Sequence, residues 1–222
     1  MAGAANRIAV YLEVGAKRSF ACALDWPGWC RSARGEDAAV EALLAYAPRY
    51  AKVARRARLA LPARISVDGV DVVERLDGTM TTDFGAPDAV PRADLRRVDA
   101  ATAQRDVALL DAAWAELDAV AAASPASLRK GPRGGGRDRD AMVEHVVEAE
   151  RSYARKVGVR MTAQEWRDGH VALLRAKLRD VLGAASSGRP PVERGWPPRY
   201  VTRRTAWHAL DHAWEMEDRR TP

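Results

Sequence analysis

Short runs of β-branched and aromatic residues, separated by polar turns, stand near the start of the chain at 7–14 and 19–24. Such runs on either side of a Gly-containing polar stretch predict two strands joined as a hairpin. A second group of β-branched residues spans 64–76 around Asp68 and Gly69, a pair that favours a tight turn and so predicts another hairpin. The first part of the chain is therefore expected to contain a small sheet.

The next pattern is helical. Residues 36–57 place apolar side chains at a spacing of three and four, which predicts a helix that Pro48 breaks or kinks. Residues 78–91 contain glycine and prolines and are expected to form a loop. We therefore expect a small domain with a sheet and a helix over about residues 1–85.

After Pro91 the apolar spacing is helical almost throughout. The predicted helices span residues 94–122, 138–157, 162–181 and 201–219. Thr162 with Glu165 three residues later has the pattern of a capping box, and Asp138 or Asp140 suits the cap of the preceding helix. Two irregular connectors, 124–137 and 185–200, join these helices. Four helices with long connections predict a four-helix bundle over residues 92–222, so the fold class is α+β.

Composition changes this picture little. The chain has 222 residues, 47% apolar and 30% charged, with a net charge of +6, which is ordinary for a globular protein. The basic surplus is diffuse and mixed with acids, so it does not indicate a nucleic-acid partner. No run approaches the length of a membrane helix, and Arg7 and Glu13 interrupt any signal-peptide core. With only Cys22 and Cys30, we expect reduced thiols and a cytoplasmic protein.

The histidines carry the candidate chemistry. His208 and His212 stand four residues apart in the last predicted helix, which places both imidazoles on one face, one turn apart. His145 lies on the apolar side of the helix predicted over 138–157, so it is expected to face the bundle axis. Three imidazoles from two helices are typical ligands for a divalent metal with a position left open for substrate. Two structural histidines on a wet groove wall are the alternative, and His170 is interpreted as structural or solvated.

Two carboxylates accompany these histidines at the same spacing. Glu215 follows His212 by three residues, and Glu148 follows His145 by three. Either carboxylate could orient a histidine or serve as a general base, and each could equally be an exposed helix charge. Both are therefore weak candidates for catalytic residues.

The segments His145-Val-Val-Glu-Ala-Glu-Arg and Trp207-His208-Ala-Leu-Asp-His212-Ala-Trp-Glu-Met-Glu-Asp218 resemble the DinB/YfiT-like superfamily of metal-binding four-helix bundles. The resemblance covers about residues 92–222. It implies that His145, His208 and His212 ligate a divalent metal. It also implies a thiol-dependent S-transferase or isomerase that uses a low-molecular-weight thiol such as mycothiol.

The first part is similar to a HicB-like domain over about residues 7–60. The resemblance rests on the Asp25-Trp-Pro27-Gly28-Trp-Cys30 turn and the helix that follows it. It implies a β-β-α-β module that acts as an accessory or dimerising domain, or that covers the metal site. A homodimer through the edge of its sheet is one further expectation.

Three functional hypotheses follow. The first is an S-transferase that joins a thiol to a small electrophile at a metal, for which zinc or nickel is favoured among metals that imidazoles accept. The second is metal-dependent hydrolysis of a small amide or ester, with Glu215 or Glu148 as the base. The third is a non-catalytic protein that binds a partner, aided by the basic linker residues Arg129, Lys130, Arg133, Arg137 and Arg139.

Overall fold

A computed structural model of the chain describes residues 7–62, 64–130 and 136–220. In chain order its elements, with η for a 3-10 helix, are β1 (Ile8–Val14), β2 (Ser19–Ala23), β3 (Cys30–Ala33), α1 (Glu36–Ala45), α2 (Ala47–Arg56), η1 (Val67–Gly69), β4 (Val70–Asp77), α3 (Met80–Phe84), η2 (Arg92–Leu95), α4 (Ala100–Ala122), α5 (Arg139–Arg155), α6 (Ala163–Arg167), α7 (His170–Leu182) and α8 (Pro198–Arg220). The fold is α+β, as predicted. The linker residue Arg133 lies outside the described residues.

The sheet has the strand order β3-β2-β1-β4. β1 and β2 form the predicted hairpin, with Leu12 opposite Ala21. The second predicted hairpin is wrong, because Asp68 and Gly69 belong to η1 and only the residues after them form a strand. That strand, β4, pairs in parallel with β1. A parallel partner requires a crossover connection, which α1 and α2 supply.

Cys22 and Cys30 differ from the expectation of reduced thiols. They lie directly opposite each other in the β2–β3 register, with their Cα atoms 4.1 Å apart, and they are joined as a disulfide. Both residues are buried, at 1% and 2% exposure. The short return from β2 to β3 brings the two cysteines together, a pairing that their eight-residue separation did not reveal.

The ends of the helices agree with the sequence predictions at some positions and differ from them at others. The predicted helix over 36–57 breaks at Tyr46, so that Pro48 lies in the first turn of α2, where its missing N–H is tolerated. The helix predicted from 94 begins instead at Ala100, because the Asp99 carboxylate accepts from Thr102 N and caps it. The Thr162–Glu165 capping box is present, but the helix stops after one turn and restarts beyond Gly169. Residues 78–91 contain α3 as well as loop.

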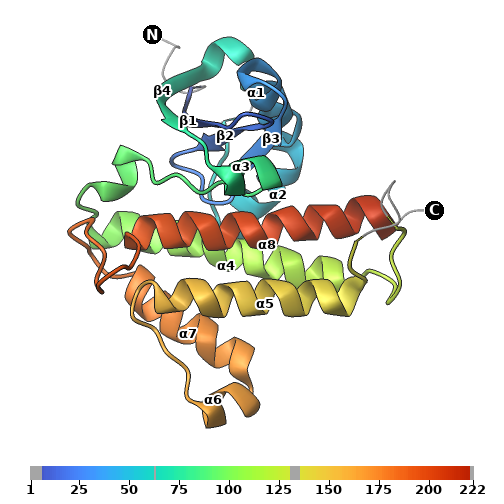
Figure 1. Cartoon of the computed structure of the whole chain (residues 1–222), viewed down its shortest axis with the longest axis vertical. Helices are drawn as coiled ribbons and strands as arrows, with labels where there is room; N and C mark the ends of the chain where they lie inside the picture. The colour runs from blue at the N-terminus through green and yellow to red at the C-terminus, as the bar shows by residue number, and fades with distance from the viewer. Residues whose placement is uncertain (1–6, 63, 131–135, 221–222) are drawn as a thin grey trace.

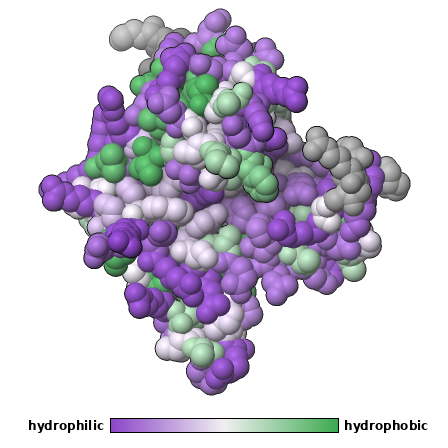
Figure 2. All heavy atoms as spheres, in the orientation of Figure 1, coloured by the Kyte–Doolittle hydropathy of each residue, from purple (hydrophilic) through white to green (hydrophobic). Residues whose placement is uncertain are grey.

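The C-terminal helices pack against one another. α8 packs against α4, α5 and α7, and it lies between the N-terminal part and α5 (Figure 1). Trp114, almost fully buried, donates to Glu150 of α5 and lies under Arg175 of α7, so it fills the space between these helices. Trp214, equally buried, packs instead on Tyr46 of the N-terminal part, with 5.1 Å between the ring centroids. Figure 2 shows hydrophilic side chains over most of the visible face of the bundle, as expected of helices that each bury one side. Among the described residues, no helix is long and apolar enough to cross a membrane.

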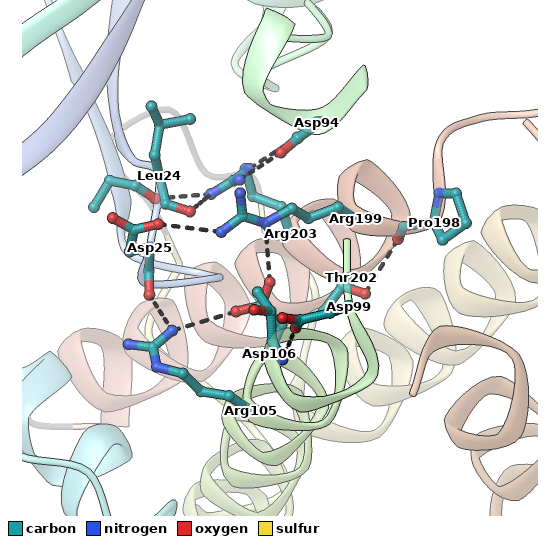
Figure 3. A network of polar contacts seen from close by, with 12 residues as sticks. Leu24, Asp25, Asp94, Asp99, Arg105, Asp106, Pro198, Arg199, Thr202 and Arg203 are labelled. Carbon is teal, nitrogen blue, oxygen red and sulfur yellow. Dashed lines mark hydrogen bonds and ion pairs between the residues drawn. The ribbon is translucent and has the colours of Figure 1, made fainter. Parts of the chain in front are cut away.

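The two parts share one hydrophobic core that extends from Ile8 to Met216. Buried polar contacts tie α8 to the sheet. Arg203 donates to the backbone carbonyls of Ala23 and Leu24 at 2.8 and 2.7 Å, and to the Asp94 carboxylate at 2.6 and 3.1 Å (Figure 3). Figure 3 also shows Arg199 bridging carboxylates from the two parts. The sheet therefore fixes the position of the helix that carries two of the candidate ligands.

Candidate metal centre

The structure brings His145, His208 and His212 together. One nitrogen from each imidazole lies within 4.8 Å of the others. The ring centroids are 5.0 Å apart for His145 and His208, 5.1 Å for His145 and His212, and 4.7 Å for His208 and His212. In the described part of the chain, this is the one group of three or more histidine, cysteine or acidic side chains close enough to share an ion.

Two packed helices produce this cluster. His208 and His212 are one turn apart on α8 and project from the same side of it. α5 packs against that side and presents His145, because Met142 and Val146 on the same stripe are buried. His208 is 6% exposed, while His145 and His212 are partly exposed. The cluster thus combines one buried imidazole with two partly exposed ones.

Glu215 selects one nitrogen of His212. Its carboxylate lies 3.0 Å from His212 Nδ1, so a proton on Nδ1 is donated to Glu215 and the Nε2 lone pair is left free. Arg219 in turn donates to Glu215 at 2.7 Å and to the Arg129 carbonyl at 2.7 Å. The hydrogen bond from His212 holds the pKa of Glu215 below its usual value. Of the two roles predicted for Glu215, its position fits the orientation of a ligand.

The surroundings of His145 and His208 favour their neutral forms. Burial lowers the pKa of His208 well below its usual value, and the neighbouring His212, His145, Arg204 and Arg137 add to the effect. Burial also lowers the pKa of His145, again with Arg137 and His212 contributing. A neutral imidazole has a lone pair to offer to a metal, whereas a protonated one does not.

The other sequence candidates lie elsewhere. Glu148 is exposed and pairs with Arg151 at 3.7 Å, with no described contact to His145. His170 is the first residue of α7 and packs on Trp166, 4.5 Å between ring centroids, outside the cluster. The structural interpretation of His170 is in line with this position, and Glu148 remains an exposed helix charge.

Two residues beside the cluster were missed in the sequence. The Tyr153 ring lies 6.0 Å from that of His208, and the Arg204 guanidinium lies over Tyr153 at 5.6 Å. Each lies one or two helical turns from a candidate ligand in the same helix. This helical spacing is the only feature of the sequence that could have placed them near the site. Glu150, also unremarked, is fully buried and receives hydrogen bonds from Trp114 and Arg175, so it supports the bundle instead of the site.

The cluster fits a divalent metal. Its donors are three imidazole nitrogens, a set that zinc and other first-row metals accept at about 2.0–2.1 Å. The buried Nδ1 atom of His208 has no hydrogen-bond partner among the described residues, and such an atom is costly to bury unless something binds it. His212 already has the supporting carboxylate that metal-ligating histidines usually have.

Comparisons with protein-family models, with curated proteins and with solved structures found nothing that matches this chain. The resemblances to DinB/YfiT-like bundles and to HicB-like domains therefore stay predictions, and functional arguments depend on the site itself.

Proposed function

We propose that His145, His208 and His212 hold one divalent metal ion, zinc or nickel, and that the protein is a metal-dependent S-transferase. In this proposal it joins a small, low-molecular-weight thiol of the mycothiol type to a small electrophile. The observation that carries the proposal is the convergence of three imidazoles from α5 and α8, one of them oriented by Glu215. The predicted resemblance to DinB/YfiT-like enzymes supports the same reaction class.

In this reaction the role of the protein is to bind the metal and to orient its ligands and substrates. A bound divalent ion lowers the pKa of a thiol and so makes the thiolate available at neutral pH. The thiol proton leaves to solvent, the sulfur forms a bond to the electrophilic carbon, and the leaving group departs with its electron pair. No oxidant or reductant is needed. Glu215 holds His212 in position, and the α8–sheet contacts hold the helix.

Hydrolysis is less well supported as an alternative. It needs a carboxylate free to accept a proton from water, with a pKa near the working pH. Glu215 is engaged by both His212 and Arg219, and its pKa is lowered instead of raised. Glu148 pairs with Arg151 at the surface. The described geometry therefore supplies orienting groups more clearly than a general base.

The reaction is tested with purified protein loaded with zinc or with nickel, mycothiol as the thiol and monobromobimane as the electrophile. We expect thioether formation above the uncatalysed rate, lost in His208→Ala and retained in His170→Ala, which removes the histidine outside the cluster. Metal-independent turnover, or turnover that survives His208→Ala, contradicts the proposal. Hydrolysis of p-nitrophenyl acetate in the absence of thiol, with no thioether formed, favours the hydrolase instead.

A further inference from the structure

Arg204 lies one helical turn before His208 on α8, beside the histidine cluster. It is 8% exposed. Its guanidinium lies over the Trp207 ring at 4.9 Å and over the Tyr153 ring at 5.6 Å. The Tyr153 ring is in turn 6.0 Å from that of His208. Two aromatic faces therefore hold a buried positive charge next to the candidate metal ligands.

Two of the buried nitrogens of this arginine have no acceptor among the described residues. Arg204 Nε and Nη1 are buried without a hydrogen-bond partner in the described part of the chain, and so is Trp207 Nε1. All three atoms only donate hydrogen bonds, so an acceptor is what this place lacks. A buried charge without a hydrogen-bonded partner is unfavourable, and native proteins rarely leave one in that state without a reason.

The preceding residue on the same helix provides the contrast. Arg203 is equally buried, at 3% exposure, but its guanidinium is bound by the Asp94 carboxylate and by two backbone carbonyls (Figure 3). The fold thus satisfies the arginine that joins the bundle to the sheet. Within residues 7–62, 64–130 and 136–220, Arg204, which lies beside the histidines, has no carboxylate partner.

The charges around the cluster point the same way. Glu215 is the carboxylate in hydrogen-bond contact with a cluster histidine, and Arg219 pairs with it. An imidazole that ligates a metal carries no charge, so three of them would not compensate the charge of a divalent ion, and the loaded site would attract a ligand with negative charge.

We propose that Arg204 is the anion-binding residue of the histidine site, and that the site takes a small molecule with a carboxylate next to the atom that faces the histidines. The carboxylate accepts from Arg204, and the Trp207 indole N–H is a second donor. This inference rests on the proposed function, because that function places the thiol sulfur of the ligand at the histidines. It adds a requirement that the function alone does not contain, namely a preference for an anionic thiol over a neutral one. It therefore favours a thiol that bears a carboxylate over mycothiol itself, whose cysteine carboxyl is tied up in an amide.

The test compares two thiols on zinc-loaded full-length protein by isothermal titration calorimetry. Mercaptoacetate carries a carboxylate beside its sulfur, and 2-mercaptoethanol carries a hydroxyl. Charge-assisted hydrogen bonds predict that wild type prefers mercaptoacetate by about 10- to 100-fold, and that Arg204→Gln loses this preference while it keeps its zinc. Comparison of the two affinity ratios cancels intrinsic differences between the thiols.

Arg220→Gln is the matched control, because it removes the same charge from an exposed position on the same helix. We expect it to keep the wild-type preference. If the ratio in Arg204→Gln equals that in wild type, Arg204 does not bind the carboxylate and the inference is wrong. Arg204→Lys guards against a folding defect. It keeps the charge and is expected to retain part of the preference if it folds as wild type does.

A separate arm distinguishes failure of the metal proposal from failure of this one. If the protein holds neither zinc nor nickel, the proposed function fails, and binding of acetate to the metal-free protein is measured by saturation-transfer NMR. An acetate signal that is present in wild type and lost in Arg204→Gln supports the anion site without the metal. No difference between the two proteins overturns it.

Discussion

Replacement of Glu215 by glutamine tests how the chain prepares His212 for a metal. The carboxylate lies 3.0 Å from His212 Nδ1, and glutamine keeps an acceptor there but removes the charge. Partners of this kind typically change metal affinity by 10- to 100-fold, or about 1.4–2.7 kcal/mol. Because the Glu215 side chain is 36% exposed, solvent screens part of the effect. We therefore expect about tenfold weaker zinc binding for Glu215→Gln, and up to about 100-fold for Glu215→Ala.

The assay is competition for zinc with a chromophoric chelator. Glu148→Gln is the matched control, since Glu148 follows His145 by the same three residues but pairs with Arg151 at the surface. It should bind zinc as wild type does. Circular dichroism and the thermal midpoint of the metal-free proteins check that the loss of the contact with Arg219 has not altered the fold. Equal zinc affinity in wild type, Glu215→Gln and Glu148→Gln would refute the reasoning.

Three further predictions concern the scaffold. Gly28→Ala should lower the free energy of unfolding, measured in urea, by about 1–3 kcal/mol more than Gly35→Ala does. Both glycines have φ near +90°, but only a Cβ at Gly28 meets α8, with its nearest atom at 2.8 Å. Equal effects of the two substitutions would show that backbone strain alone matters. Arg203→Met should lower the free energy of unfolding by about 3–5 kcal/mol, because it leaves the buried Asp94 carboxylate unpaired. A decrease below about 1 kcal/mol in the same urea unfolding experiment would contradict this. Hydrogen bonds and ion pairing lower the pKa of Glu165 from 4.5 to about 2. Its contribution to stability is therefore present above about pH 4.5 and is lost as the pH falls towards 2. An NMR titration midpoint of Glu165 near 4.5 would contradict this prediction.

Local patterns predicted much of the fold. The first hairpin, the helix break near Pro48 and the capping box at Thr162 depend on neighbouring residues, and each is present. The partner of a strand does not depend on neighbours. Residues 70–77 pair with β1 about sixty residues away, so the β-branched run was correctly assigned as strand but wrongly as half of a hairpin. The disulfide between Cys22 and Cys30 was missed for the same reason.

Some residues of the candidate site could likewise be predicted from local patterns, and others could not. Helical spacing places His208 and His212 on one face, and the apolar stripe beside His145 indicates which way it points, so the cluster could be predicted from the sequence. Glu215 and Glu148 could not be distinguished by spacing, because each stands three residues after a histidine. Only the packing of the neighbouring side chains separates them. Arg204 is the clearest case, since the absence of an acceptor is a property of everything around it.

The most direct test of the central claim is the metal content of the purified protein, measured by mass spectrometry after incubation with zinc or nickel and removal of excess ion. Wild type is compared with the double variant His208→Ala, His212→Ala. The proposal predicts about one ion per chain in wild type and almost none in the variant. No bound ion in wild type, or the same content in both proteins, would show that the three histidines are not a metal centre.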